Sequence, residues 1–351
     1  DIKGYVLNRA YQSYRQPGSC IKPLNVYTPY LQLGNTPDTK VTDSQIDGGP
    51  ANADASYAGE MTLTDAVKWS KNTVAWNIYQ QITPKTGSSF LIKMGFHKIW
   101  VDKDYNAGAL GGFTYGVTTE EMAGGYAALA NDGVYRKATC IRLIVDASNK
   151  TVVNETNRDS KVYDKSASRM MTQMLREVVL SGTGTSANVE NAVVAGKTGT
   201  TNASKDVWFC GYSKYYTTTV WAGYDYPKEM SGVNSRVNAI FKDFMTAVHT
   251  NLPVTDFSTV TQQTTQPETT AAVQEETESL PQETTAIVPE TTGIEQVTPQ
   301  QVPSTTAQVP TTTPYQRWTT APAQPKTTAP MQYGDIDATT RTDPDATARG
   351  E

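Results

Sequence analysis

Apolar residues recur with a helical period at the end of the first 250 residues. Val237, Ile240, Phe241, Phe244, Met245 and Val248 follow the spacing i, i+3, i+4, i+7, i+8, i+11, which predicts a helix over 237–248. A similar apolar face, built on methionine, leucine and valine, predicts a helix over 168–180. Three shorter periodic segments predict helices over 61–69, 73–82 and 120–131.

The segments between the predicted helices 168–180 and 237–248 alternate with the period of strands. They predict strands over 193–200, 206–212 and 216–224, with a hairpin at 213–215. In the middle strand Val207, Phe209 and Gly211 would face one side, and Trp208, Cys210 and Tyr212 the other. We therefore expect an α+β fold in which a three-stranded antiparallel sheet is backed by the last helix.

Near the start of the chain, Pro17-Gly18 interrupts the backbone immediately before Ser19, and an apolar helical face begins at Ile21. Pro23 is compatible with a first helical turn, where its missing N–H has no partner to lose. We therefore predict Ser19 at the N-terminus of a helix. Pro29 predicts a kink or an early end of that helix.

Composition divides the chain near residue 253. Residues 261–351 contain 24 Thr and 11 Pro, with only isolated apolar residues. Such a segment cannot bury enough apolar surface to offset the entropy of ordering it. We expect one domain over 1–252 and a disordered Thr/Pro/Gln/Glu-rich tail over 253–351, either a solvated tail without a site or a wall-spanning or glycosylated stalk.

Charge and cysteine usage exclude several function classes. Residues 1–260 carry 26 Lys+Arg against 23 Asp+Glu, and residues 261–351 carry 4 against 12, so the net charge of −5 comes from the tail. The near-neutral first part gives no reason to expect nucleic acid binding. Cys20, Cys140 and Cys210 lie far apart, with only two histidines in the chain, so we expect free thiols and no metal site. No apolar run approaches the ~18–20 residues of a membrane span.

Three short motifs carry the candidate chemistry. Ser19-Cys20-Ile21-Lys22 reads S-x-x-K, Ser70-Lys71-Asn72 reads S-x-N, and Lys197-Thr198-Gly199-Thr200 contains K-T-G. S-x-x-K, S-x-N-like and K-T-G motifs occur together in penicillin-binding proteins and serine β-lactamases. In that combination they supply a nucleophile, a base and a cationic group that binds an anion.

Two of these motifs have second copies. Lys85-Thr86-Gly87 follows Pro84 in a polar turn, whereas Lys197 ends an apolar run typical of a strand. Ser186-Ala187-Asn188 lies too close to Lys197 in sequence to be a separate middle motif, whereas Ser70 lies between two predicted helices. We therefore favour the copies at Ser70 and Lys197.

The flanking residues extend the resemblance. Residues 15–23 resemble the active-serine segment of class A (bifunctional) penicillin-binding proteins, and residues 196–212 resemble their third motif and the following strand. Matching patterns also occur at 109–112, 116–118 and 182–187, so the likeness covers about residues 4–250. Cys20 departs from the family, which usually has a small hydroxyl residue there.

This resemblance implies a β-lactamase/transpeptidase-like fold and a serine D,D-transpeptidase that needs no metal or organic cofactor. Its partners would be peptidoglycan stem peptides ending in D-Ala-D-Ala, and β-lactams would acylate it. Family members place two sheet strands, a glycosyltransferase domain and a membrane anchor before the active serine, which here is residue 19. We therefore expect an incomplete sheet, a fragment of a longer protein, and an anchor that places the domain on the extracytoplasmic face of a bacterial membrane.

The residue types allow roles to be assigned as expectations. Three residues apart on a helix, Ser19 and Lys22 face the same side, so Lys22 can serve as the base. Its neutral form at pH 7 requires a pKa about 3.4 units below the usual ~10.4, which burial and the nearby cation Lys197 could supply. Ser70 would relay protons, and Asn72 would bind the substrate backbone.

The K-T-G motif and the histidines complete the candidate site. Lys197, Thr198 and Thr200 suit the terminal carboxylate of the stem peptide, with Gly199 part of the same binding strand. By family resemblance, the backbone N–H groups of Ser19 and Thr200 would form the oxyanion hole. His97 and His249 have no nucleophile signature nearby, and we expect them to be structural or surface residues.

Two other functions remain open from the residues alone. The same acyl-enzyme chemistry with water as acceptor would make the chain a D,D-carboxypeptidase or a β-lactamase. Alternatively, the chain could be a catalytically dead wall-binding fragment that only holds stem peptides.

Overall fold

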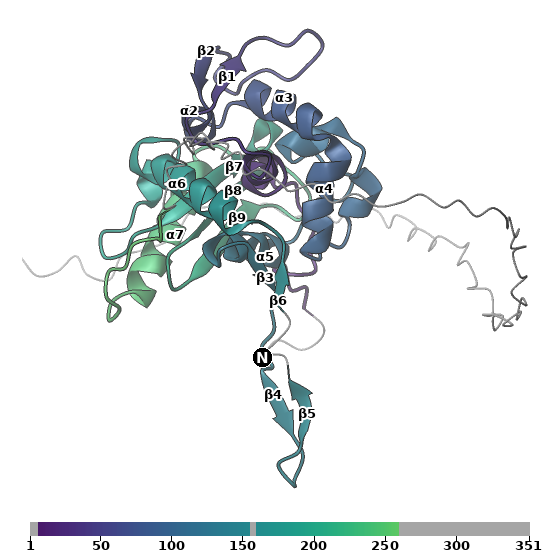
Figure 1. Cartoon of the computed structure of the whole chain (residues 1–351), viewed down its shortest axis with the longest axis vertical. Coiled ribbons are helices and arrows are strands. Elements are labelled where there is room, and N and C mark those ends of the chain that lie inside the picture. The colour runs from purple at the N-terminus through teal and green to yellow at the C-terminus, as the bar shows by residue number, and fades with distance from the viewer. Residues whose placement is uncertain (1–5, 155–158, 260–351) are drawn as a thin grey trace, which may run out of the picture. The chain divides into compact units, whose positions relative to one another are not determined.

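A three-stranded antiparallel sheet lies at the centre of the domain. It appears in a computed structural model that describes residues 6–154 and 159–259. Strands β7 (Ala195–Thr200), β8 (Asp206–Tyr212) and β9 (Thr217–Gly223) are ordered β7-β8-β9 (Figure 1). The sheet is open and the fold is α+β, as predicted, although β7 starts two residues later than expected.

The two faces of the sheet belong to two apolar clusters. Trp208, Cys210 and Tyr212 join the larger cluster, and the Tyr212 ring meets Tyr126 edge-on, with ring centroids 6.3 Å apart. On the other face Phe209 packs on Phe241 of α7 (Val233–Val248) at 4.5 Å. The predicted alternation of β8 is therefore confirmed, and the last helix backs the sheet.

Three further helices follow the predicted apolar periods closely: α3 (Asn72–Ile82), α5 (Thr119–Ala130) and α6 (Lys165–Ser181). The domain also contains α2 (Leu63–Lys68), which is shorter than predicted, and α4 (Pro84–Lys93), for which no apolar period was predicted. A capping box fixes the start of α5, because the Thr118 side chain accepts from the Glu121 N–H and the Glu121 side chain accepts from the Thr118 N–H.

The helix predicted over 61–69 begins too early. Its first residues instead belong to strand β2 (Gly59–Thr62), which pairs antiparallel with β1 (Lys40–Asp43). Thr62 then caps α2, since its Oγ1 accepts from the Asp65 N–H at 3.1 Å. Neither strand carries an apolar alternation, so the pairing could not be read from the periodicity.

The segment after Gly18 changes its winding twice. It runs as a 3₁₀ turn η1 (Gly18–Ile21), a π-helical turn η2 (Pro23–Tyr27) and a short α1 (Thr28–Leu31). Ser19 lies in the first turn, as predicted, and the helix ends two residues after Pro29. In the π turn the Thr28 N–H bonds the Pro23 carbonyl, five residues back.

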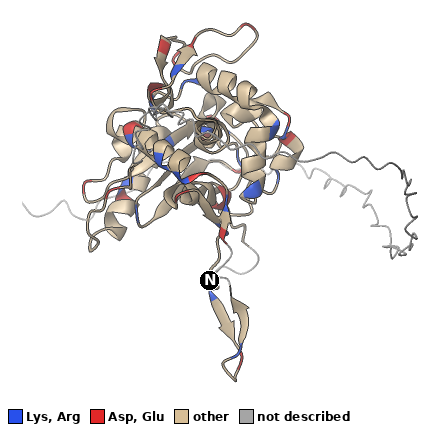
Figure 2. Ribbon diagram, in the orientation of Figure 1, with Lys and Arg blue, Asp and Glu red and all other residues tan. Residues whose placement is uncertain are grey.

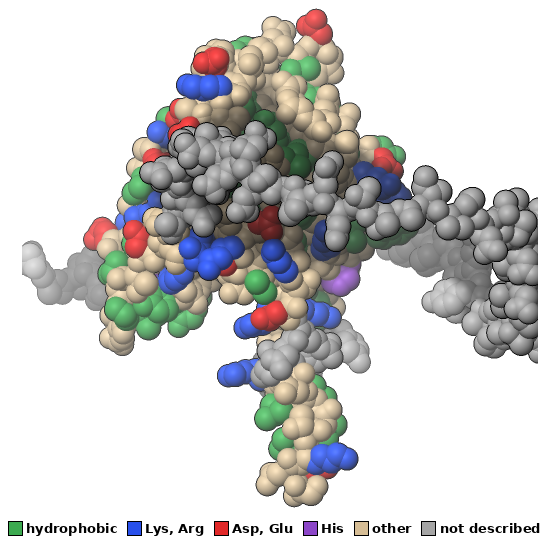
Figure 3. Space-filling model, viewed as in Figure 1, with side chains coloured by type: hydrophobic (Ala, Val, Ile, Leu, Met, Phe, Trp, Pro, Cys, Tyr) green, Lys and Arg blue, Asp and Glu red, His purple; other side chains and the backbone are tan. Residues whose placement is uncertain are grey.

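Short elements connect these parts. They are η3 (Ile99–Asp102), η4 (Asn106–Leu110), η5 (Thr185–Ala187), η6 (Asn202–Ser204), β3 (Val134–Arg136), β4 (Leu143–Val145), β5 (Thr151–Asn154) and β6 (Asp159–Lys161). The β4–β5 hairpin stands apart from the rest of the domain (Figure 1). Apolar side chains occupy its surface (Figure 3).

The described residues after 252 still contact the domain. The Tyr215 hydroxyl donates to the Pro253 carbonyl at 3.1 Å, and the Phe257 ring meets the Tyr212 ring at 5.5 Å. The disordered tail predicted over 253–351 lies outside the described residues from 260 on. Within 6–154 and 159–259, no helix has the length and apolar character needed to cross a bilayer.

Candidate active site

The first and third motifs meet because a glycine lets the edge strand β7 approach the turn that carries Ser19. A Cβ on Gly199 would lie 2.6 Å from the Pro17 carbonyl oxygen and 3.0 Å from the Cys20 nitrogen, too close for any other residue. The Cys20 thiol donates to the Lys197 carbonyl at 3.2 Å. Two segments about 180 residues apart in sequence are thus in direct contact.

The 3₁₀ winding of η1 places Lys22 above Ser19. The Lys22 N–H bonds the Ser19 carbonyl, and residues i and i+3 eclipse one another in this kind of helix. Ser19 is partly exposed, whereas Lys22 is fully buried. Ser19 is therefore partly open to solvent, whereas the amine of Lys22 is not.

The Lys22 amine is held by the middle motif. Its Nζ donates to the Ser70 carbonyl at 2.9 Å, to the Lys71 carbonyl at 3.3 Å and to Asn72 Oδ1 at 2.8 Å. All three acceptors belong to the turn between α2 and α3, which the sequence predicted as the position of S-x-N. The first and second motifs are therefore joined by hydrogen bonds of one side chain.

Lys197 reaches the same turn from the other side. Its Nζ donates to Ser70 Oγ at 2.8 Å and to the Thr198 carbonyl at 3.1 Å. Ser70 has a φ of 58°, a left-handed backbone conformation that is uncommon outside glycine. In that conformation its carbonyl meets one lysine and its hydroxyl the other, so Ser70 connects the two amines.

Burial lowers the pKa of both lysines. The pKa of Lys22 lies well below its ordinary value, mainly because the amine is removed from water and also because Lys197 is nearby. Burial lowers the pKa of Lys197 to about 8. The lowered pKa of Lys22 favours its neutral form, whereas a pKa of about 8 leaves most of Lys197 charged at pH 7.

The expected hydrogen bond between Ser19 and Lys22 is not formed. Among the described residues, the Ser19 hydroxyl makes no hydrogen bond, since the Lys22 amine is engaged by the three oxygens of the S-x-N turn. The two groups share one side of one turn, so a change of side-chain rotamer is the movement that would join them. Catalytic hydrogen bonds are often loose in structures without substrate.

The other predicted binding residues lie around these amines. The Thr198 hydroxyl is 2.7 Å from the Thr183 hydroxyl, and the exposed Thr200 donates to Asn234 Oδ1 at 3.2 Å. Thr200 also borders the nucleophile turn, because a Cβ on Gly18 would lie 3.0 Å from its carbonyl oxygen. The structure thus brings all eight predicted site residues, from Ser19 to Thr200, to one region; their roles stay predictions.

Several polar residues of this region were not identified from the sequence. Lys71, inside the middle motif, is 6% exposed and pairs with Asp43, whose carboxylate is fully buried, at 3.3 Å. Asn52 accepts a hydrogen bond from the backbone N–H of Asn72 at 2.7 Å. No spacing rule connects residues 43 and 52 to residue 72, so only the position of Lys71 between Ser70 and Asn72 offered a signal.

The second copies of the motifs lie elsewhere. Lys85 is exposed in the first turn of α4, and Ser186 Oγ accepts from the Asn238 amide at 2.8 Å. His97 has an exposed ring beside Glu121, and His249 is buried between Ser213 and the Met245 carbonyl. No cluster of three His, Cys, Asp or Glu side chains within the described residues could hold a metal ion.

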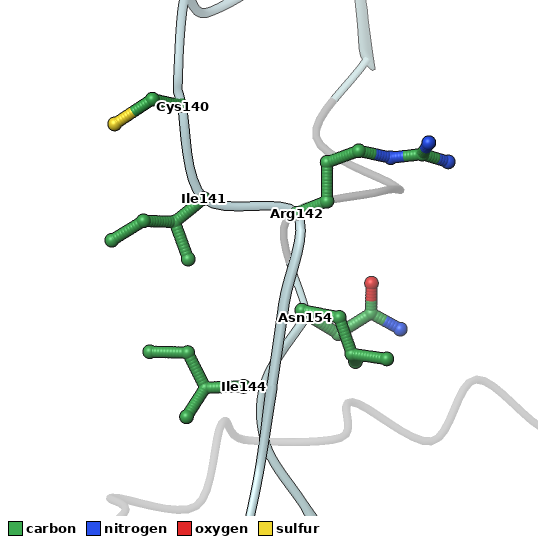
Figure 4. Close-up of a pocket in the computed structure, with 6 residues that line it drawn as sticks. Cys140, Ile141, Arg142, Ile144 and Asn154 are labelled. Carbon is green, nitrogen blue, oxygen red and sulfur yellow. The ribbon is translucent and has the colours of Figure 1, made fainter.

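A hollow lies on the β4–β5 hairpin, away from the three motifs. It is lined by Cys140, Ile141, Arg142, Leu143, Ile144 and Asn154 (Figure 4). None of these residues belongs to the three motifs. Lys and Arg are interspersed with Asp and Glu over the ribbon (Figure 2).

Comparison with known proteins agrees with this geometry. Residues 1–246 match the family described as "Penicillin binding protein transpeptidase domain". The chain is 36% identical to penicillin-binding protein 4 of Bacillus subtilis over 236 residues, which are 66% of this chain and 38% of that protein. It is 37% identical to penicillin-binding protein 1A of Aquifex aeolicus over 266 residues, 71% of this chain and 35% of that protein.

Solved structures share the fold. The penicillin-binding protein PonA1 of Mycobacterium tuberculosis aligns with a TM-score of 0.61 and 22% identity, over 73% of each chain. The same protein in complex with penicillin V also aligns with a TM-score of 0.61, over 73% of this chain and 74% of that one. The chain spans less than two fifths of the length of the two relatives compared by sequence.

Proposed function

Because the chain belongs to the family of penicillin-binding protein transpeptidase domains, we propose that it cross-links peptidoglycan stem peptides as a D,D-transpeptidase, through an ester on Ser19. One observation carries the proposal. The Lys22 amine is fully buried, its pKa is lowered, and it lies one 3₁₀ turn from a partly exposed serine. A serine needs a base within hydrogen-bond reach to act as a nucleophile at neutral pH, and a change of the Lys22 rotamer would bring the amine there.

In the acylation step, neutral Lys22 takes the proton of Ser19 Oγ as Oγ attacks the carbonyl carbon of the penultimate D-alanine. The C–N bond to the terminal D-alanine then breaks, and the leaving amine takes a proton from Ser70 Oγ, which regains one from Lys197 at 2.8 Å. The proton held by Lys22 passes to Lys197, so that Lys22 is neutral again before the transfer step. The product is an ester between Ser19 and the donor stem peptide. β-Lactams would form the same ester by opening of their amide ring.

In the transfer step, an amine of a neighbouring stem peptide attacks that ester. Its proton passes to Lys22, the ester C–O bond breaks as the new peptide bond forms, and Lys22 returns the proton to the Ser19 oxygen. Lys197, Thr198 and Thr200 would bind the terminal carboxylate of the donor, with positive charge and hydroxyl donors on one strand. No metal or organic cofactor takes part in either step.

Labelling by a fluorescent penicillin tests this proposal. The full chain should take up one equivalent of stable label, and Ser19→Ala should take up none. Ser186→Ala, in the second S-x-N copy, is the matched control and should label like the unchanged chain. A folded wild-type chain that takes up no label, or equal labelling of Ser19→Ala, would overturn the proposal.

The acceptor distinguishes transpeptidase from carboxypeptidase or β-lactamase activity. With a donor peptide ending in D-Ala-D-Ala, a transpeptidase gives a cross-linked product when an acceptor amine is added. Release of only the shortened donor, at the same rate with and without the amine, would support a hydrolase. The relatives are longer proteins, and we propose by analogy that this domain works on the extracytoplasmic face of a bacterial membrane.

A further inference from the structure

A loop outside the three motifs holds the S-x-N turn by hydrogen bonds to both the backbone and the side chain of Asn72. Asn52 Oδ1 accepts from the Asn72 N–H at 2.7 Å and from the Thr73 N–H at 3.3 Å. The neighbouring Ala51 carbonyl accepts from Asn72 Nδ2 at 2.9 Å. The connection between β1 and β2 therefore holds Asn72 at two atoms, its N–H and its side-chain amide, and Thr73 at its N–H.

The first of these contacts completes a helix that has no cap of its own. The residue before α3 is Lys71, whose side chain makes no capping hydrogen bond. The first N–H groups of a helix need acceptors, and Asn is among the best residues in that role. Asn52 provides the acceptor from 20 residues earlier in the chain.

The second contact fixes which way the Asn72 amide points. A carbonyl oxygen such as that of Ala51 can only accept, so the NH₂ group of Asn72 must face it. The amide oxygen then faces Lys22 Nζ, at 2.8 Å. The Ala51 carbonyl thus sets the orientation of the Asn72 amide, whose oxygen accepts a hydrogen bond from the candidate base Lys22.

A buried carboxylate in turn holds Asn52. Asp43 Oδ1 accepts from Asn52 Nδ2 at 2.6 Å, and Asp43 Oδ2 accepts from the Ala58 N–H at 2.9 Å and pairs with Lys71. Asp43 is fully buried, and hydrogen bonds to its charged form, the largest from Thr73 and Asn52, outweigh burial and lower its pKa. A buried charge with several donors locks the groups around it.

We propose that Asn52, held by Asp43, is a positioning residue for acylation: it fixes Asn72 and through it the amine of Lys22. This inference rests on the proposed function only for its kinetic consequence. It predicts that loss of the Asn52 amide lowers the rate of the acylation step more than it weakens penicillin binding, because the base is displaced while the binding strand β7 stays intact.

Saturation kinetics with a fluorescent penicillin on the full chain test this prediction. Asn52→Ala should lower the acylation rate constant roughly tenfold to a hundredfold, the effect of a small misplacement of a reacting group, with a Kd changed by less than about threefold. Asp54→Asn is the matched control, since Asp54 lies in the same loop and pairs with Lys71 but its side chain is 59% exposed. The acylation rate constant of Asp54→Asn should stay within about twofold of that of the unchanged chain.

A double variant that exchanges Asp43 and Asn52 tests whether the acylation rate constant can be restored. Asn52→Asp alone places two carboxylates in contact and should lower the rate constant. Asp43→Asn together with Asn52→Asp restores the donor and the acceptor between these two residues at the same net charge. It should recover part of the rate constant, since the Ser56 carbonyl, which accepts from Asn52 Nδ2, loses its donor. Unchanged rate constants in folded Asn52→Ala, or a loss explained entirely by the unfolded fraction measured by circular dichroism, would overturn the proposal.

Hydrogen exchange separates this inference from the proposed function. In Asn52→Ala, the amides of Asn72 and Thr73 should exchange at least about tenfold faster than in the unchanged chain, whereas those of β7 should not change. This holds whether or not the chain reacts with penicillin. If the unchanged chain does not label, the function fails while faster exchange at these two amides still supports the contact; unaltered exchange overturns the inference.

Discussion

The tripeptide Lys-Thr-Gly occurs twice in this protein, in two different environments. In β7 the lysine is fully buried, bonded to Ser70 and in reach of the nucleophile turn. In α4 the lysine is exposed, and the threonine N–H is bonded to Thr83 in the first helical turn. The difference shows that the same three residues bury their lysine and join another motif only in the strand.

Replacement of Lys197 and of Lys85 should give the largest difference in acylation rate between the two copies of the motif. Lys197→Met removes the cation that contacts Ser70 and is proposed to bind the substrate carboxylate, and should lower acylation by roughly 10²–10³-fold. Lys85→Met should leave the acylation rate unchanged. Penicillin labelling rates measure both, and similar losses in the two variants would contradict the distinction.

Replacement of the two glycines should separate stability from activity. A Cβ on Gly199 would lie 2.6 Å from the Pro17 carbonyl, and one on Gly87 would lie 2.4 Å from the Asn25 carbonyl. Both Gly→Ala variants should lose about 1–3 kcal/mol of unfolding free energy, measured by denaturant titration. Only Gly199→Ala should also slow labelling of the folded molecules, because only it displaces the turn that carries Ser19.

The threonines should show a smaller contrast of the same kind. Thr198→Val removes a hydroxyl that bonds Thr183 beside the amines, and should weaken binding of a donor peptide up to about tenfold. Thr86→Val affects an exposed hydroxyl near Thr83 and should change stability by less than about 0.5 kcal/mol. Equal donor affinities for Thr198→Val and the unchanged chain would remove Thr198 from the binding site.

The smallest effect is a pH dependence of donor binding. With a pKa of about 8, the charged fraction of Lys197 falls from about nine tenths at pH 7 to about a quarter at pH 8.5, so affinity for a carboxylate donor should fall about fourfold. A donor ester without the carboxylate should bind equally at both pH values. A parallel decline for the ester would assign the pH dependence to another group.

The lowered pKa of Lys197 also makes the unfolding free energy depend on pH, but with the opposite sign to donor binding. Its value is 10.5 in the absence of perturbation, so between about pH 8 and pH 10.5 the unfolded chain binds more protons at Lys197 than the folded chain. The unfolding free energy from this residue should therefore rise with pH across that range. The rise should be smaller in Lys197→Met, and what is left should come from Lys22, whose pKa is also lowered.

Much of the sheet could be predicted because its strands alternate cleanly. The residues of β8 face two separate apolar clusters, and the pattern of Val207, Trp208 and Phe209 carries that information locally. Strands β1 and β2 lack such a pattern and were missed, since their pairing depends on partners rather than on their own residues.

The motif spacing identified the residues that meet at the candidate site but not what holds them. The 3₁₀ turn that aligns Ser19 with Lys22 agrees with their three-residue spacing. The contacts of Asp43 and Asn52 with the S-x-N turn are single side-chain hydrogen bonds between distant segments. Hydrogen bonds of that kind leave no period in a sequence, and only coordinates reveal them.

The borrowed cap of α3 has a consequence for how the chain folds. A peptide limited to residues 63–82 would contain the S-x-N turn and the helix but not the acceptor for its first amides, so water would have to satisfy them. The turn therefore reaches its final geometry only after the loop from Asp43 to Thr73 has closed. The final geometry of the middle motif thus depends on contacts about 20 residues apart in sequence, although its own residues are adjacent in the chain.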